Sequence, residues 1–326
     1  MNRSCFLTGA LGCIGAWVVK HVLDRGEDPV VFDLGNDMRR IQDLVEPEDL
    51  ERVRLIQGDV TDTDAVLAAV RESGADRIVH LAGLQVPFCK ADPVLGARVN
   101  VVGTLNLFQA AAACEISRVV YASSAAVYGP DDLGPGGSAP DEDTPLNPTT
   151  HYGVYKRANE GNAKVFFADS GVSSVGIRPL TVYGVGRDQG MTSDPTRAMK
   201  AAVLGRPFQI RFSGATDYQF ASDCAATFLE CADKAPQGAH IFNLHGESTD
   251  MSQVVELIRQ NAPEGADGIT VDGPTLPIPP GLDGSRIDDV IPGLPKTGLA
   301  DGVRMTMEHF ARLRDEGRLE TRDLDE

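Results

Sequence analysis

Two side chains four residues apart, Tyr152 and Lys156, form the only Tyr-x-x-x-Lys pair in the sequence. They follow Pro148-Thr149-Thr150, and because threonine is a good helix N-cap, we expect both on one face of a helix. A nearby ammonium group favours the phenolate and lowers the pKa of a tyrosine toward the working pH. The pair is therefore a candidate general base, although the same spacing also suits an ordinary pair on a helix surface.

Two serines, Ser123 and Ser124, directly follow the apolar run 118–122, which has the pattern of a buried strand. Ligands of parallel α/β sheets bind at the carboxyl ends of the strands. A hydroxyl at this position can hold a substrate oxygen beside a tyrosine base. Serines that merely end a strand are also common, so this signal gains weight only from the others.

Three glycines, Gly9, Gly12 and Gly15, follow an apolar strand at the start of the chain, and we expect a helix to begin at Gly15. Glycines let such a turn close on a pyrophosphate, which the helix N-terminus then holds. Asp33 ends a second apolar run, 18 residues after Gly15. A carboxylate there accepts hydrogen bonds from an adenosine ribose and repels a 2′-phosphate, which predicts NAD as the cofactor. The nearby Arg39-Arg40 pair leaves NADP open.

Strand and helix signals alternate along the first half of the chain, which predicts an α/β fold of the Rossmann type with a doubly wound parallel sheet. One long helix is expected over 95–113, and a strand near 241–244 rejoins the sheet. The remaining segments, rich in glycine and proline, predict a smaller carboxyl-terminal substrate lobe whose tail frays after Gly317. The expected domains are an NAD-binding domain, 1–178 with about 218–246, and a substrate lobe, 179–217 with 247–326.

Composition narrows the class of protein. The net charge of −17 over 326 residues, without a basic cluster, argues against nucleic acid as a partner. The six cysteines form no Cys-x-x-Cys pair and the six histidines are scattered, so we expect reduced thiols and no metal site. Without a leader or an 18-residue apolar run, we expect no membrane contact and a cytoplasmic location.

Taken together, these motifs make the sequence resemble the extended short-chain dehydrogenase/reductase family, in the branch called NAD-dependent epimerase/dehydratase. The resemblance covers nearly the whole chain. The matching segments are the glycine loop 8–15, Asp33, Gly58-Asp59-Val60, His80-Leu81-Ala82-Gly83, Val99-Asn100, Gly103-Thr104, the segment 123–129, Tyr152, Lys156, Arg178-Pro179, Val182-Tyr183-Gly184 and Gly186-Arg187-Asp188.

The resemblance implies a role for each matching residue. Ser124, Tyr152 and Lys156 would be catalytic, with Tyr152 as the base and Lys156 also holding the nicotinamide ribose. The residues implied to bind NAD are Gly9, Gly12, Ile14, Gly15, Asp33, Asp59, Val60, Leu81, Ala82, Gly83, Asn100, Tyr152, Lys156 and Leu180. The resemblance also implies a homodimer that pairs the helix near 95–113 and the Tyr152 helix with their symmetry mates.

Departures from the family pattern narrow the reaction. Ala125 and Ala126 stand where dehydratases of the family carry an acid pair, which disfavours dehydration. Thr181 and Thr216 replace an asparagine and an arginine that contact the substrate or its diphosphate in nucleotide-sugar epimerases. A lost charge-assisted contact removes roughly 1.5–3 kcal/mol of recognition, so a smaller substrate becomes more attractive.

An anionic group on the substrate would need a nearby arginine, either Arg187 or, less directly, Arg197 or Arg211. The segments 84–87 and 184–194 are expected to shape the substrate pocket. The candidate substrate-binding residues are Val86, Ser123, Thr181 and Arg187.

Three functions remain open on these grounds. The first is a dehydrogenase that takes hydride from a secondary hydroxyl of a sugar, sugar acid or related polyol. The second is an epimerase, acting on a sugar or nucleotide sugar, which returns the hydride to the other face of a transient ketone. The third is a non-catalytic NAD-binding sensor, which the intact Ser124, Tyr152 and Lys156 disfavour.

Overall fold

A seven-stranded sheet forms the centre of the protein, in a computed structural model that describes residues 3–130, 138–263, 268–276 and 278–325. Its strands are β1 (Ser4–Thr8), β2 (Asp28–Asp33), β3 (Arg54–Gln57), β4 (Arg77–His80), β5 (Arg118–Ala122), β6 (Ser173–Arg178) and β10 (Ala239–Asn243). They lie in the order β10-β6-β5-β4-β1-β2-β3, and each paired strand runs parallel to its neighbour. From β1 the chain adds β2 and β3 on one side, and β4, β5 and β6 on the other. Folds of this kind bind dinucleotides at the point where the strand order changes side, here between β1 and β4. The predicted doubly wound sheet is confirmed.

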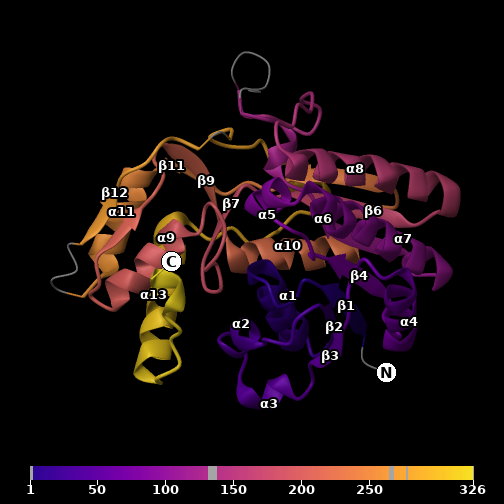
Figure 1. Ribbon diagram of the computed structural model, residues 1–326, viewed down its shortest axis with the longest axis horizontal. Helices are drawn as coiled ribbons and strands as arrows, with labels where there is room; N and C mark the ends of the chain where they lie inside the picture. The colour runs from indigo at the N-terminus through magenta and orange to yellow at the C-terminus, as the bar shows by residue number, and fades with distance from the viewer. Residues whose placement is uncertain (1–2, 131–137, 264–267, 277, 326) are drawn as a thin grey trace.

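Helices cover both faces of this sheet (Figure 1). Successive residues of a strand point to opposite sides, so an apolar strand presents side chains for burial on both faces. In β5, Val120 packs into one apolar cluster, and Val119 and Tyr121 pack into the other. The longer helices on the Val120 side are α1 (Cys13–Asp24) and α10 (Ala221–Lys234), and those on the other side are α4 (Thr63–Ser73), α7 (Gly103–Ala113) and α8 (His151–Ser170). The shorter helices of this half are α2 (Arg39–Gln42), α3 (Pro47–Leu50), α5 (Val86–Ala91), α6 (Pro93–Ala97) and the turn η2 (Ala125–Val127).

The single helix expected over 95–113 contains a wider turn. Between α6 and α7 the chain forms a π-helical segment, η1 (Arg98–Val102). Inside it, the side-chain amide of Asn100 donates to the Gly96 carbonyl at 3.0 Å and to the Leu84 carbonyl at 3.2 Å. This side chain therefore ties the helix to the loop after β4, a contact that local helical periodicity does not predict.

The carboxyl-terminal third adds a second group of elements. A three-stranded sheet holds β9 (Ala215–Phe220) between β7 (Thr181–Tyr183) and β11 (Glu247–Asp250), and β8 (Phe208–Ile210) pairs with β12 (Ile269–Val271). The helices here are α9 (Asp194–Val203), α11 (Met251–Asn261), α12 (Ser285–Val290) and α13 (Leu299–Asp315). The returning strand β10 joins the central sheet, whereas β9 does not, and the two-domain division remains a prediction. No helix in the described part of the chain is long and apolar enough to cross a membrane.

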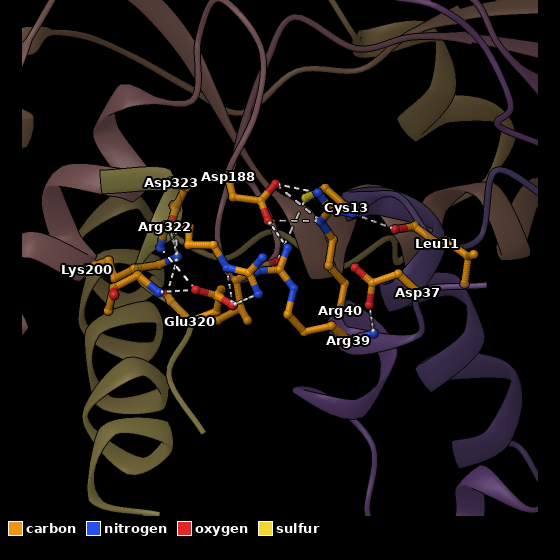
Figure 2. A network of polar contacts seen from close by, with 12 residues as sticks. Leu11, Cys13, Asp37, Arg39, Arg40, Asp188, Lys200, Glu320, Arg322 and Asp323 are labelled. Carbon is orange, nitrogen blue, oxygen red and sulfur yellow. Dashed lines mark hydrogen bonds and ion pairs between the residues drawn. The ribbon is translucent and has the colours of Figure 1, made fainter. Parts of the chain in front are cut away.

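The tail expected to fray is packed against α9. Lys200 of α9 donates to both carboxylate oxygens of Asp323, at 2.8 and 2.9 Å (Figure 2). Arg197 donates to the Asp323 carbonyl. Asp323 lies in a short turn, η4 (Arg322–Leu324), and is only 7% exposed. The prediction of a frayed tail is wrong because two buried cations of α9 need oxygen partners, and the tail supplies them.

Candidate active site and cofactor cleft

A glycine turn closes β1 against the loop after β4. Gly9 has φ +68°, and a Cβ atom there would lie 2.4 Å from the Ala82 nitrogen. A Cβ atom on Gly15 would lie 2.3 Å from the Gly9 carbonyl oxygen. Helix α1 begins at Cys13, two residues before the expected start, with Gly12 as its N-cap. Only glycine fits this cradle, which leaves the helix N-terminus open toward the cleft.

A cleft of about 890 Å³ opens at the carboxyl ends of the central strands. Asp33, at the end of β2, lies on its wall and accepts a hydrogen bond from the Leu11 nitrogen at 3.2 Å. The residues expected to bind NAD that line the cleft are Gly9, Gly12, Ile14, Gly15, Asp33, Asp59, Val60, Leu81, Ala82, Gly83, Tyr152, Lys156 and Leu180. The cleft thus brings together residues from several strand ends, as a dinucleotide site requires.

Asn100 is the exception, since it lies behind the cleft wall. Its side chain is 1% exposed, and its Oδ1 atom has no hydrogen-bond partner among the described residues. A Cβ atom on Gly83 would lie 2.7 Å from that oxygen. Asn100 therefore backs Gly83, where a larger residue would not fit.

Helix α8 carries the candidate base into the cleft. Thr150 is its N-cap, with the hydroxyl accepting a hydrogen bond from the Gly153 nitrogen at 3.1 Å. A Cβ atom on Gly153 would lie 2.3 Å from the Ala126 carbonyl oxygen, so glycine is needed for this close approach. Tyr152, the residue before Gly153, lines the cleft together with Ser124. The sequence reasoning missed Gly153, although its position next to the tyrosine was a usable signal.

Lys156 lies one turn further along α8 and is 5% exposed. Its ammonium donates to the Ala122 carbonyl at 2.7 Å and lies 5.5 Å from the centre of the Tyr152 ring. Burial lowers the pKa of Lys156 to about 8.

The pKa of Tyr152 is raised, which the expected effect of Lys156 does not predict. Burial raises this pKa, and the hydrogen bond with Ser124 and the positive charge of Arg187 act against it. The expectation of a lowered pKa is wrong in this structure because desolvation of the phenolate outweighs these contacts.

Ser123 has a different role from its neighbour. Its hydroxyl donates to Oε1 of Glu160 at 2.6 Å, and Glu160 also accepts two bonds from Arg178, at 2.8 and 2.7 Å. Ser123, Glu160 and Arg178 are each 5% exposed or less. The Ser123 hydroxyl is thus held in a buried network, and Ser124 is the serine left to meet a substrate. Glu160 was not predicted, although it follows Lys156 by four residues on the same helix face.

Thr181, a predicted substrate contact, points away from the cleft. Its neighbours Leu180 and Val182 line the cleft, and alternation along β7 turns the Thr181 side chain to the other side. There its hydroxyl meets that of Thr216 at 2.9 Å. The two residues that depart from the family pattern therefore satisfy each other, and the prediction that Thr181 lines the substrate pocket is not supported by its position.

Val86 and Arg187, two of the predicted substrate contacts, line the cleft together with Met191 and Thr192. The Arg187 guanidinium donates to the Thr192 hydroxyl at 3.0 Å. The other two candidate arginines, Arg197 and Arg211, both pair with the buried Asp194, at 3.4 and 2.7 Å, and do not line this cleft.

Asp188, which follows β7, connects this segment to helix α2 (Figure 2). Its carboxylate accepts from Arg40 at 2.6 Å and from Arg39 at 3.0 Å, and Arg40 also donates to the Leu11 carbonyl at 2.8 Å. Both arginines that left NADP open are therefore engaged with a carboxylate, which the sequence reasoning did not foresee.

A doubly wound sheet with a glycine cradle, an acidic residue at the end of β2, and a serine, a tyrosine and a lysine at one cleft defines a nicotinamide-dependent enzyme of the short-chain dehydrogenase/reductase type. The model of the NAD dependent epimerase/dehydratase family matches residues 5–244. The chain belongs to this family.

Comparison with individual proteins agrees with that assignment. The chain is 29% identical to the UDP-glucose 4-epimerase of Mycolicibacterium smegmatis, over 93% of this chain and 97% of that protein. The UDP-glucose 4-epimerase of Thermus thermophilus, solved with NAD, superposes with a TM-score of 0.79 at 25% identity, covering 94% of this chain and 99% of that one. MoeE5, solved with UDP-glucuronic acid and NAD, superposes with a TM-score of 0.78 at 25% identity, covering 95% of this chain and 99% of that one.

The cofactor is NAD, as in the family and in these neighbours. The cleft fits it, because the cradle at Gly9 and Gly15 has no room for a side chain and Asp33 suits an unphosphorylated ribose. Among the described residues, no three histidine, cysteine or acidic side chains lie together as a metal site would require.

Proposed function

We propose that the protein is an NAD-dependent carbohydrate epimerase that inverts a secondary hydroxyl through a transient ketone. The observation that carries this proposal is that Ser124, Tyr152 and Lys156 line one cleft. The chain that forms this cleft is similar to a UDP-glucose 4-epimerase over nearly its full length. This similarity supports the epimerase better than the dehydrogenase that the departures at Thr181 and Thr216 favour.

The side chains divide the chemistry in this proposal. Tyr152, as the phenolate, takes the hydroxyl proton of the substrate and returns it to the ketone oxygen, while Ser124 donates a hydrogen bond to that oxygen. Lys156, anchored on the Ala122 carbonyl, fixes its charge next to the tyrosine and the nicotinamide ribose. When bound, NAD accepts the hydride from the substrate carbon and gives it back.

Other reactions of the family receive less support. Ala125 and Ala126 line the cleft and carry no group that moves a proton, so elimination of water has no acid pair. A dehydrogenase remains the second candidate, and the buried Thr181–Thr216 pair favours it, since a small substrate needs no diphosphate contact.

The test uses a substrate deuterated at the reacting carbon, excess NAD, and absorbance at the wavelength of reduced nicotinamide. An epimerase gives the epimer with deuterium retained at that carbon and no net reduced cofactor. Reduced cofactor that accumulates in proportion to consumed substrate would establish the dehydrogenase instead. Failure to take up NAD in calorimetry would exclude both.

We also propose that the protein forms a homodimer through α5, α6, η1 and α8. This face exposes Phe88, Val94, Val102, Val154 and Val165 to between 40% and 64% of their area. Apolar side chains gathered on neighbouring helices favour burial against a partner. Light scattering should give twice the mass of one chain for the natural protein. The double variant Val154→Glu, Val165→Glu should give the mass of one chain. A monomeric natural protein would refute the dimer.

The location that we propose is the cytoplasm. All six cysteines are free, and Cys5, Cys89, Cys224 and Cys231 are buried. Unpaired buried thiols suit a reducing compartment. Fractionation of cells that produce the protein tests this, and recovery in a membrane or exported fraction would contradict it.

A further inference from the structure

Three cationic side chains line the cleft, and two of them are already engaged. They are Arg40, Lys156 and Arg187. Arg40 pairs with Asp188, and Lys156 donates to the Ala122 carbonyl beside the candidate base. Arg187 is therefore the cation that remains for a ligand at the substrate end.

The surroundings of Arg187 leave its charge uncompensated. Within the part of the chain that the structure describes, it forms no ion pair, and its buried Nε atom has no hydrogen-bond partner. The two nearest carboxylates in the sequence are taken, since Asp188 binds Arg39 and Arg40 and Asp194 binds Arg197 and Arg211. A guanidinium left without a counter-charge in a cleft favours an anionic ligand.

A second polar side chain stands beside it. A Cβ atom built on Gly190 would lie 2.2 Å from the Gln85 Oε1 atom and 3.2 Å from the Arg187 Nη2 atom, so the two side-chain ends flank the same point. An amide and a guanidinium side by side can bind the two oxygens of one carboxylate. Apolar Val86 and Met191 line the cleft near them and would exclude water from such a contact.

We infer that Arg187 binds a carboxylate of the substrate, and that the substrate is a sugar acid or another hydroxy acid. This inference rests on the proposed function, because it places the carboxylate in the same cleft as Tyr152 and Ser124. Arg187 and Tyr152 line the same cleft, and the positive charge of Arg187 acts to lower the pKa of the Tyr152 phenol. The proposal thus places the substrate carboxylate in the same cleft as the reacting hydroxyl.

A diphosphate explains the observations less well. The positions that contact a diphosphate in nucleotide-sugar epimerases are the neutral pair Thr181 and Thr216, whose hydroxyls are turned toward each other. In a nucleotide sugar the diphosphate also lies across the ring from the hydroxyl that a 4-epimerase inverts. An anion bound in the same cleft as Tyr152 suits a carboxylate attached to the sugar itself.

The test compares matched probes on the NAD-loaded protein by calorimetry and by turnover. The acids are glucuronate and gluconate, their neutral partners are glucose and glucitol, and UDP-glucose and glucose 1-phosphate represent phosphate anions. We expect an acid to bind at least tenfold more tightly than its neutral partner, and Arg187→Met to remove that difference. Arg187→Lys, which keeps the charge but loses the planar fork, should recover part of it. Arg304→Met, on the exposed face of α13, is the control and should change nothing.

The inference is overturned if neither acid binds better than its neutral partner, if Arg187→Met leaves the affinity for acids unchanged, or if UDP-glucose or glucose 1-phosphate is preferred. Melting temperatures of both Arg187 variants check that they are folded. Loss of NAD uptake by the natural protein would instead overturn the proposed function. Turnover of a neutral sugar or UDP-glucose with no response to acids would leave that function standing and refute only the carboxylate.

Discussion

The side-chain oxygens of Thr181 and Thr216 lie 2.9 Å apart, and both residues are 1% exposed or less. Neither hydroxyl faces the cleft, so the pair serves the packing of β7 against β9. Where the family pattern has an amide and a guanidinium directed at a ligand, this chain has two small groups that hydrogen-bond to each other. The substrate must then be recognised by other side chains.

Removing one hydroxyl of this pair should destabilise the fold, and removing both should not. Thr216→Val leaves the Thr181 hydroxyl buried without a partner, which costs about 1–3 kcal/mol in the free energy of unfolding. Thr181→Val should cost a similar amount, whereas the double variant should lie close to the natural protein. Urea denaturation of the four proteins measures the cycle. A double variant as unstable as the sum of the single variants would show that the hydroxyls do not interact.

Replacing Tyr152 with phenylalanine should remove turnover and leave NAD binding nearly intact, because only the proton-transfer oxygen is lost. We expect a fall in turnover of about 10²–10⁴-fold. Tyr155→Phe is the matched control, since its hydroxyl lies on the same helix and donates to the Pro93 carbonyl at 2.7 Å. Steady-state rates and calorimetry with NAD measure the two effects. An active Tyr152→Phe protein would mean that another group is the base.

Because of Lys156, the free energy of unfolding of the ligand-free protein should rise with pH in the alkaline range. Its pKa of about 8 lies below the ordinary value of 10.5, because burial disfavours the ammonium. Between these two values the unfolded chain binds the proton more tightly, so the free energy of unfolding gains up to about 1.4 kcal/mol per pH unit as the pH rises.

The Lys156→Met protein lacks this gain. Compared with it, the natural protein should become steadily more stable from pH 8 to 10.5, with a constant difference below pH 8. Denaturation series on both proteins across this range measure the difference. Parallel curves would show that the Lys156 pKa is not lowered by folding.

Asp188→Asn should weaken the link between the two halves of the molecule and relax cofactor selection. Removing the carboxylate leaves Arg39 and Arg40 without their partner, and because this ion-pair cluster is only partly buried we expect a cost of about 1–3 kcal/mol in the free energy of unfolding. The freed Arg40 lies next to Leu11, the residue that also meets Asp33, so it can reach a 2′-phosphate. We expect the ratio of NADP to NAD affinity to rise roughly tenfold.

Calorimetry with both cofactors and thermal melting check this prediction, with Asp301→Asn, in an exposed ion pair of α13, as the control. A lower melting temperature with an unchanged affinity ratio would limit Asp188 to a structural role.

Features that depend on neighbouring residues in the sequence could be predicted. The glycine turn, the strand ending at Asp33 and the helix capped at Thr150 each carry a local signal of spacing or residue type. Because strand ends of a parallel sheet meet at one edge, these local signals also predicted that Ser124, Tyr152 and the expected cofactor residues share one cleft, and of these only Asn100 lies outside its lining.

Features that depend on contacts between distant segments could not be predicted from the sequence. The partners Arg40 and Asp188 are 148 residues apart, and no local pattern pairs them. The direction of Thr181 depends on which residue of a three-residue strand faces the cleft, and a shift of one position reverses the answer. The π turn at Asn100 likewise carries a hydrogen bond to the Leu84 carbonyl, outside the helix, which local periodicity does not predict.

The pairing of β10 with β6 has a consequence for the newly made chain on the ribosome. One edge of β6 lies against β5, but its other edge waits for β10, which is synthesised only after β7, β9 and α10. Until then the bare main-chain groups of β6 can recruit strands of other chains, and aggregation competes with folding. A fragment that stops at Arg178 would keep this edge of β6 open permanently, and we expect it to aggregate more readily than the whole chain.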